Sequence, residues 1–246
     1  MEVKFSINLL LLMIIEFRPD VIIHCCRLSG RWKIGRYFAA IKGYIANKRL
    51  IHALKKCNQN IHIIYVSGSL MYGDCNEKKI YEDNHLNPLS FAKQYIIAEY
   101  PFLKTYQHLN VTLCRPAWIV GDSSWFKTYY IDHIKTHQSI PCYGAGNNLM
   151  NLISIQSCAS KIVNLINKSS LKQVQNIVQF ESITQKQFCK SLAHYYQLPI
   201  THYSHKARYM SNAAYQAFQI SCNLASYNSK NISKFNLKTL INQYSI

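Results

Sequence analysis

Short apolar runs alternate with longer amphipathic segments through the first half of the chain. Continuous apolar runs of this length are typical of strands that are buried on both faces of a sheet. The longer segments carry apolar residues at helical spacing and predict helices between those strands. The predicted strands are 21–23, 61–66 and 111–114, and the predicted helices are 7–17, 36–57 and 90–108. This alternation predicts an α/β fold with a doubly wound, mainly parallel sheet.

The periodicity is weaker beyond Gly121. Residues 123–150 are aromatic and contain Gly, which indicates loops, as in a substrate-binding region. Farther along, hydroxyl side chains mark two helix starts, because Ser and Thr accept hydrogen bonds from the free N–H groups of a first turn. The elements predicted there are a helix over 158–167 capped by Ser157, a strand at Ile177-Val178, and a helix over 185–196 capped by Thr184.

The chain is strongly basic, with 28 Lys and Arg against 11 Asp and Glu and a net charge of +17. This excludes an acidic solvating chain and makes an anionic partner reasonable. Residues 21–73 hold nine cations and no acid. Two interpretations fit that stretch: a surface that binds a polyanion such as RNA, or a solvated helix face in a chain of biased composition. No nucleic-acid-binding motif accompanies it.

The nine cysteines are scattered, and no Cys-x-x-Cys pair or zinc-ligand spacing occurs. We therefore expect no metal site and a reducing, cytoplasmic location. The longest apolar run, about residues 5–15, is too short to cross a bilayer. Without a small-residue cleavage site after it, the run predicts a buried helix in a soluble protein with no membrane contact.

Five segments, in order and spacing, resemble the motifs of one enzyme family. They are RPDVIIHCC (18–26), YVSGSLMYG (65–73), EDNHLNPLS (82–90), LNVTLCRP (109–116) with Gly121 beyond, and NLISIQSCA (151–159). The family is the extended short-chain dehydrogenase/reductase family of NAD-dependent nucleotide-sugar epimerases and dehydratases. The resemblance covers about residues 10–200.

The resemblance implies a Rossmann-type sheet that carries NAD(P), and hydride transfer at a sugar carbon of a nucleotide-sugar ligand. In such a site a Tyr hydroxyl exchanges a proton with the sugar hydroxyl, and a Lys ammonium lowers the Tyr pKa from its usual value of about 10. A Ser or Thr hydroxyl positions the reacting oxygen. We expect a partial NAD(P)-binding domain over 1–121 and a substrate-binding-like region over 122–246. Segments at about 151–180 of that region are expected to return to the sheet domain.

The family's three catalytic positions are altered in this sequence. The motif registers place the Ser/Thr position at Gly68, with the nearest hydroxyls on Ser67 and Ser69. They place the Tyr position at Phe91 and the Lys position at Tyr95. No catalytic residue is therefore expected to be intact.

Literal Tyr-x-x-x-Lys strings occur elsewhere, at Tyr44–Lys48 and Tyr100–Lys104. The first lies on the earlier predicted helix. The second contains Pro101 and comes about nine residues late against the family's spacing. We therefore expect neither string to supply the catalytic pair.

The family's Gly-rich cofactor loop has no counterpart either, because the first Gly is Gly30, after the first predicted strand. Such glycines let the backbone approach the pyrophosphate at a helix N-terminus. The sheet is therefore expected to lack its first βαβ unit, of roughly 30 residues. Truncation and a start-site error both explain this, and retained NAD(P) binding is in doubt.

The remaining candidate contacts lie where strands end or where aromatic residues gather. The candidate cofactor contacts are His24, Cys25, Cys26, Ser67 and Pro116, and the candidate substrate contacts are Trp118, Trp125 and Tyr143. Each has a purely structural interpretation: His24 as a buried strand-end residue, the serines as loop hydrogen-bonding groups, and the aromatic residues as core packing.

Two hypotheses of function follow. The first is a nucleotide-sugar oxidoreductase or isomerase by descent that is catalytically inactive alone. The second is a non-catalytic binding protein that contacts a polyanion or a protein partner through its basic surface. A homodimer formed through helices 36–57 and 90–108 is a further expectation, although Lys42, Lys48, Lys55 and Lys56 would oppose it.

Overall fold

The computed structural model describes residues 7–26, 33–57, 60–104, 109–166, 173–228 and 232–242. Its centre is a four-stranded parallel sheet in the order β1-β2-β3-β8. The strands are β1 (Val21–His24), β2 (His62–Val66), β3 (Val111–Pro116) and β8 (Val174–Ile177). This arrangement confirms the expected mainly parallel α/β fold.

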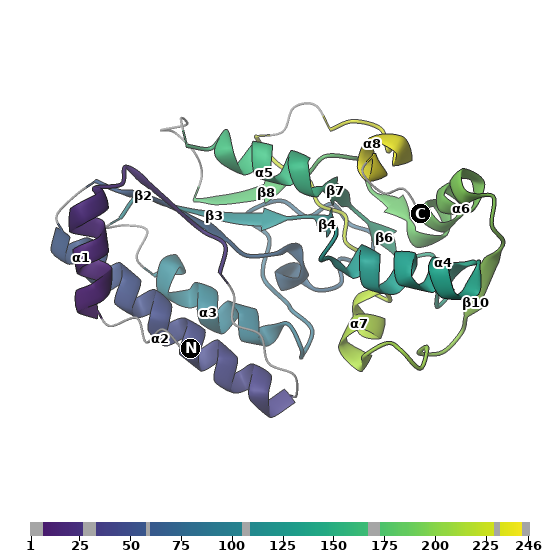
Figure 1. The fold of residues 1–246 in the computed structure, drawn as a ribbon, viewed down its shortest axis with the longest axis horizontal. Helices are drawn as coiled ribbons and strands as arrows, with labels where there is room; N and C mark the ends of the chain where they lie inside the picture. The colour runs from purple at the N-terminus through teal and green to yellow at the C-terminus, as the bar shows by residue number, and fades with distance from the viewer. Residues whose placement is uncertain are drawn as a thin grey trace.

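Helices cover both faces of the sheet (Figure 1). One face carries α1 (Ile7–Phe17), α2 (Lys33–Cys57) and α3 (Lys93–Leu103), and the other carries α5 (Ile155–Val163). Side chains alternate between the faces along each strand. Ile63 therefore packs with Leu54 and Phe102 beneath the first group of helices, while Ile64 belongs to the core on the α5 side, together with Cys158.

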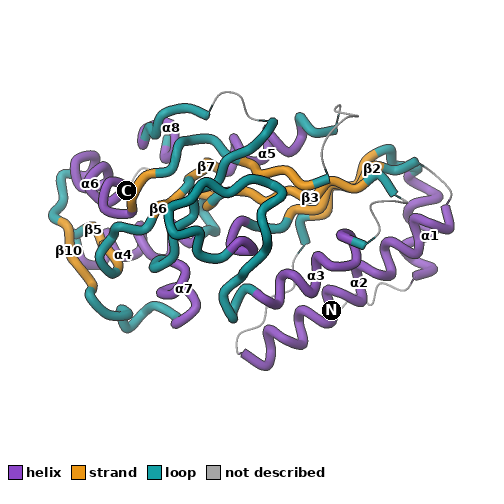
Figure 2. Tube along the Cα trace, turned by 180° about the vertical axis from the view of Figure 1, so that it is seen from behind, coloured by secondary structure: helices purple, strands orange, loops and turns teal. Residues whose placement is uncertain are grey.

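Apart from α5 and β8, most of the second half of the chain packs at the other end of the molecule (Figure 2). Three two-stranded sheets lie there: β4 with β7, β5 with β10, and β6 with β9. The elements of this region are β4 (Trp118–Val120), η2 (Lys127–Ile131), α4 (Asp132–His137), β5 (Ile140–Tyr143), β6 (Leu149–Met150), β7 (Leu152–Ser154), β9 (Ile183–Thr184), α6 (Gln185–Tyr196), β10 (Ile200–Tyr203), α7 (Asn212–Ala217) and α8 (Leu237–Ile241). The short helix η1 (Ser69–Tyr72) follows β2 in the sheet region.

The expectation of loops over 123–150 was wrong. Residues 127–137 are helical throughout as η2 and α4, and β5 follows directly at Ile140. Phe126, Tyr130 and Ile134 recur at spacing of four and are all buried. This spacing places the three side chains on one helix face, and the many aromatic residues obscured it.

Element boundaries agree in part with the expectations. The helices over 7–17 and 185–196 are confirmed at both ends. The expectation that the helix over 7–17 is buried was wrong, because Leu12, Ile15 and Phe17 are exposed and Ile14 alone among its described side chains is buried. The helix expected over 90–108 is shorter, because α3 begins at Lys93 and Lys104 is its C-cap. Residues 105–108 lie outside the described residues. The strand expected at Ile177-Val178 is β8, which ends at Ile177.

The cap expected at Ser157 was also wrong. Ser154 is the N-cap of α5, and its hydroxyl accepts a hydrogen bond from the Ser157 N–H at 3.2 Å. The helix therefore begins at Ile155, three residues before the predicted start. The cap expected at Thr184 is confirmed, and it forms a reciprocal capping box with Gln187.

No helix of the described residues is long and apolar enough to cross a membrane. All nine cysteines are free thiols, and six of them are buried.

The assignment of the α5 cap can be tested by replacing two serines of the same helical turn, one at a time. Ser154→Ala removes the side-chain acceptor of the first turn, so it should lower the free energy of unfolding by about 1 kcal/mol. Ser157→Ala removes a hydroxyl without a capping role and should change it by less than about 0.5 kcal/mol. Urea unfolding followed by circular dichroism measures both variants. Equal losses in the two variants would contradict the assignment of the cap.

Candidate functional site

The carboxyl ends of parallel strands meet at one edge of the sheet, where open α/β folds bind their ligands. His24 ends β1, Ser67 follows β2, and Arg115 and Pro116 end β3. The structure therefore brings the ends of these strands to one edge. What each side chain contacts there decides what chemistry the edge can support.

A buried ion pair lies behind this edge. Arg115 Nη2 donates to Glu99 Oε1 at 2.6 Å, and the two side chains are 3% and 0% exposed. The Ser67 hydroxyl donates to the other carboxylate oxygen of Glu99 at 2.5 Å. Both oxygens of a buried carboxylate therefore have partners, from the ends of two neighbouring strands. Ser67, one of the two hydroxyls nearest to the family's Ser/Thr position, is thus bonded to this pair. The other, Ser69, is buried at the start of η1.

The Arg115 guanidinium also contacts Tyr72 on η1. Its Nη1 donates to the Tyr72 hydroxyl at 3.1 Å, and that hydroxyl donates to Asn176 Oδ1 on β8 at 2.8 Å. Burial raises the pKa of Tyr72 despite the opposing effect of Arg115, so the hydroxyl stays protonated at neutral pH. Burial disfavours the charge on Arg115, but Glu99 and Tyr72 outweigh it and raise the pKa of Arg115. The cluster is thus a charged arginine held by a carboxylate and a neutral phenol.

The remaining family positions are Gly68, Phe91 and Tyr95. Gly68 has extended backbone, and open space surrounds the position of a Cβ. Phe91 precedes α3 and packs partly buried against the main core. Tyr95 lies on α3 and lines a pocket beside α2. The catalytic assignments of these positions stay predictions.

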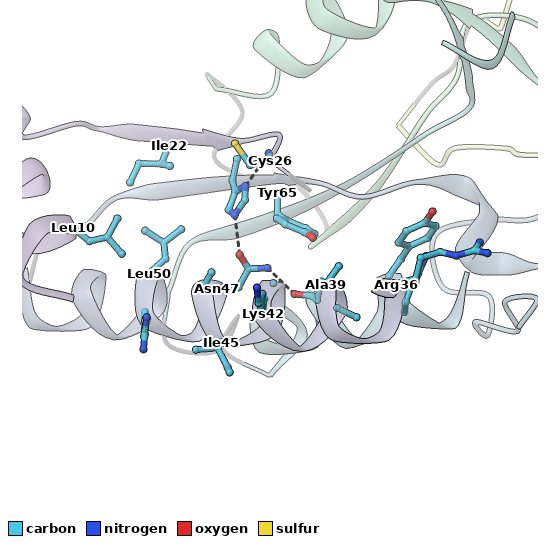
Figure 3. Close-up of a pocket in the computed structure, with 18 of the residues that line it drawn as sticks. Leu10, Ile22, Cys26, Arg36, Ala39, Lys42, Ile45, Asn47, Leu50 and Tyr65 are labelled. Carbon is cyan, nitrogen blue, oxygen red and sulfur yellow. Dashed lines mark hydrogen bonds between the residues drawn. The ribbon is translucent and has the colours of Figure 1, made fainter. Parts of the chain in front are cut away.

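His24 faces the same pocket and is held in a fixed orientation (Figure 3). Its Nδ1 accepts the Cys26 N–H at 3.2 Å, so in the neutral ring Nε2 carries the proton and donates to Asn47 Oδ1 at 2.8 Å. Asn47 in turn donates from Nδ2 to the Ala98 carbonyl at 2.8 Å. Burial lowers the pKa of His24, which keeps the ring neutral. The ring therefore links β1 to α2 and, through Asn47, to α3.

The described residues at the strand ends fit a dinucleotide poorly. His24 and Ser67 are both bonded within the fold, and Pro116 has no side-chain donor. Cys25 and Cys26 are exposed, and burial raises the pKa of Cys25, so its thiol stays protonated at neutral pH. None of these groups forms an anion-binding turn, and Gly30 lies outside the described residues. We therefore derive no chemical step through a nicotinamide.

The three candidate substrate residues pack into the aromatic core of the second region. Trp118 meets the Trp125 ring edge-on at 4.9 Å and the Phe218 ring at 5.1 Å. Tyr143 lies 5.0 Å from Phe218 and donates its hydroxyl hydrogen bond to the Tyr129 carbonyl at 2.5 Å. The indole N–H groups of both tryptophans have no hydrogen-bond partner among the described residues. Their role toward a substrate stays a prediction.

The two Tyr-x-x-x-Lys strings form cation–π pairs within their own helices. Lys48 Nζ lies 5.8 Å from the Tyr44 ring centroid, and Lys104 Nζ lies 5.1 Å from that of Tyr100. Residues four apart meet on one helix face, which explains these contacts without any catalytic role. In the described part of the chain, no three His, Cys, Asp or Glu side chains are grouped so that they could hold a metal ion.

The polar cluster around Arg115 and Glu99 was not predicted from the sequence. Arg115 entered only as part of the LNVTLCRP motif, and Glu99 was not among the candidate residues. The sequence nevertheless holds a signal for this pair. Glu99 is the one acid in an apolar helix, and Arg115 is the one cation in an apolar strand. Because buried charges are rarely unpaired, these two residues could have been predicted to form an ion pair.

A second buried polar cluster lies in the C-terminal region. His133 on α4 contacts the Ser139 hydroxyl and the Tyr209 hydroxyl, each at 3.2 Å. The His137 ring stacks on it at 4.3 Å. Burial, followed by repulsion from His137, lowers the pKa of His133 to about 4. The cluster therefore holds a neutral imidazole at physiological pH.

Comparisons with known proteins identify the fold. The family model described as "NAD dependent epimerase/dehydratase family" matches residues 8–179. No curated protein sequence matches. Among solved structures, the Bordetella bronchiseptica enzyme WbmG in complex with NAD and UDP aligns at 15% identity with a TM-score of 0.74, over 96% of this chain and 74% of that one.

Two further structures align equally well. The UDP-N-acetylglucosamine 4-epimerase of Bacillus cereus has 12% identity and a TM-score of 0.75, over 97% of this chain and 79% of that one. The dTDP-glucose 4,6-dehydratase of Streptomyces venezuelae, with NAD and TYD bound, has 12% identity and a TM-score of 0.74, over 96% and 74%. At these identities the likeness shows the fold.

The His133 cluster predicts acid sensitivity. The folded-state pKa of about 4 lies below the unfolded value of 6.5, so protonation favours the unfolded chain as the pH falls from 6.5 to 4. From pH 7 to pH 5, His133 should lower the free energy of unfolding by about 2 kcal/mol. Urea unfolding at both pH values measures this loss.

His133→Gln should reduce the loss between pH 7 and pH 5 by about 2 kcal/mol. The loss that remains includes that from His24 and His62, whose pKa values burial also lowers. His194→Gln, on the exposed face of α6, should leave the full loss in place. A pH dependence unchanged in His133→Gln would contradict the assignment.

Proposed function

Because the chain belongs to the NAD dependent epimerase/dehydratase family, we propose that it is a nucleotide-sugar oxidoreductase or isomerase by descent that is catalytically inactive on its own. The family match and the fold shared with nucleotide-sugar enzymes support the descent. The residues at the strand ends support the loss of activity.

One observation carries the proposal of inactivity: the Ser67 hydroxyl donates to Glu99, which also binds Arg115. A hydroxyl that positions a reacting oxygen must be open to the substrate. Here its proton is directed into a buried carboxylate. Phe91, where the family has its Tyr, carries no exchangeable proton. Loss of a positioned acid or base alone typically costs about 10²–10⁴ in rate.

We extend the proposal to the cofactor and the setting of the protein. NAD(P) binding is lost or weak, because His24 and Ser67 are bonded within the fold. The nine free thiols support a reducing, cytoplasmic location. Dimerisation through α2 and α3 stays a prediction, and the exposed Tyr37, Phe38 and Tyr100 on these helices are compatible with it.

A second candidate function is that of a non-catalytic binding protein. Helix α2 carries cations and no acid along 25 residues. Arg36, Lys42 and Arg49 form no ion pair with any described carboxylate. Such unpaired charge favours an anionic partner, either a polyanion such as RNA or an acidic protein.

Titration with NADH and NADPH tests the main proposal. Nicotinamide fluorescence should show no saturable binding at cofactor concentrations up to about 1 mM. The dissociation constant would then exceed about 1 mM, so the binding free energy would be weaker than about 4 kcal/mol. WbmG, whose solved structure contains NAD, serves as the positive control for the assay. Saturable binding in the low micromolar range would contradict the loss of the cofactor site. Turnover of UDP-N-acetylglucosamine by the purified chain would contradict inactivity.

A further inference from the structure

Two buried thiols meet in the C-terminal region, where α6 packs on β5 (Figure 2). Cys142 lies on β5 and Cys189 on α6, and both side chains are fully buried. The Cys189 thiol donates to the Pro141 carbonyl at 3.3 Å, which places its sulfur beside the peptide that leads into Cys142. One helical turn earlier, Gln185 Oε1 accepts the Tyr143 N–H at 2.6 Å. These contacts fix α6 against β5, and the two thiols are hydrogen-bonded to each other.

The two sulfurs differ in acidity. The hydrogen bond from Cys189, aided by the positive charge of Lys186, outweighs burial and lowers the pKa of Cys142. The hydrogen bond to Cys142, together with burial, raises the pKa of Cys189. Cys142 is therefore the sulfur that loses its proton first, while Cys189 keeps its proton and donates it. A thiolate beside a protonated thiol is the arrangement of a reactive dithiol.

A loop with two glycines covers the Cys142 sulfur. This loop, over 144–148, joins β5 to β6, and a Cβ added at Gly146 would lie 2.8 Å from Cys142 Sγ. The sulfur therefore lies directly against the loop at a position without a side chain. Ala145 and Asn147, on either side of Gly146, are exposed. A small oxidant thus has only this loop to pass on its way to Cys142.

We propose that Cys142 and Cys189 are a site of peroxide modification, where oxidation to a disulfide joins α6 covalently to β5. The Cys142 thiolate attacks one oxygen of hydrogen peroxide, the O–O bond breaks, and Cys142 becomes a sulfenic acid. The hydroxide that leaves takes up the proton that Cys142 had released. The Cys189 sulfur then attacks the Cys142 sulfur, and the sulfenic oxygen leaves as water with the Cys189 proton. Two thiols and one peroxide thus give one disulfide and two waters, and a reducing thiol reverses the change by exchange.

A second pair of buried thiols gives a matched control within the same chain. Cys114 on β3 and Cys158 on α5 belong to the same core as the proposed pair. Burial, and then the nearby Cys158, raise the pKa of Cys114 to about 12, and burial raises that of Cys158 to about 11. Both thiols therefore stay protonated, and we expect them to stay reduced under peroxide. The inference does not depend on the loss of catalysis.

Treatment of the full chain with hydrogen peroxide tests the proposal, and peptide mapping by mass spectrometry without reductant is the readout. The Cys142–Cys189 disulfide should form, and dithiothreitol should remove it. In Cys189→Ser the serine hydroxyl still donates toward Cys142 but cannot form a disulfide, so dimedone should label Cys142 as the sulfenic acid. In Cys142→Ser the protonated Cys189 should be oxidised at least about tenfold more slowly than Cys142 is in Cys189→Ser. Cys158→Ser should leave formation of the disulfide unchanged.

The exposed Cys26 shows in the same maps that the oxidant was active. A Cys142–Cys189 pair that stays reduced after Cys26 has been oxidised would overturn the proposal. So would oxidation of Cys114 and Cys158 at the same rate as the proposed pair, because it would mean that peroxide reacts with an unfolded chain. The wild-type chain carries this test without any substitution, so it does not require that either serine variant folds. The NADH titration is independent of each of these outcomes.

Discussion

The buried ion pair between Arg115 and Glu99 joins the end of β3 to α3, at the edge of the sheet where the candidate site lies. Removing two charges from water is costly, and the cost is offset only when each charge is paired and hydrogen-bonded. Here Glu99 receives Arg115 and Ser67, and Arg115 also contacts Tyr72. The pair thus fixes α3 against the ends of β2 and β3 and holds η1 beside them. In the function that we propose, the Ser67 hydroxyl that donates to this network is not available to a substrate.

The sheet follows from local sequence, whereas the cluster does not. The apolar runs at 21–23, 61–66 and 111–114 predict three strands correctly. The expected burial on both faces holds for β2 and β3, whereas β1 is only partly buried. The bond from Ser67 to Glu99 joins residues 32 apart in sequence. Sequence patterns place each group at its strand or helix, but only the tertiary packing decides which hydroxyl reaches which carboxylate.

The errors have the same origin. Ser154 rather than Ser157 caps α5, because the buried strand β7 ends at Ser154 and the helix begins at the next residue. The helix over 127–137 was missed because its buried face is aromatic, and aromatic clusters are equally typical of ligand loops. In both cases packing within the fold, and not local propensity alone, sets where the element begins.

The basic composition has a structural counterpart on α2. The net charge of +17 alone suggested any polyanion. Arg36, Lys42 and Arg49 on α2 form no ion pair with a described carboxylate, so part of this charge lies unpaired on one helix of the sheet region.

The central claim is that the polar groups at the strand ends are bound into the fold through Arg115 and Glu99. A double-mutant cycle of Glu99→Gln and Arg115→Met, measured as free energies of unfolding, tests this claim directly. The account predicts that each single variant loses about 3 kcal/mol and that the double variant recovers part of the loss, with a coupling energy of at least about 2 kcal/mol. Losses that add to within about 0.5 kcal/mol would contradict it.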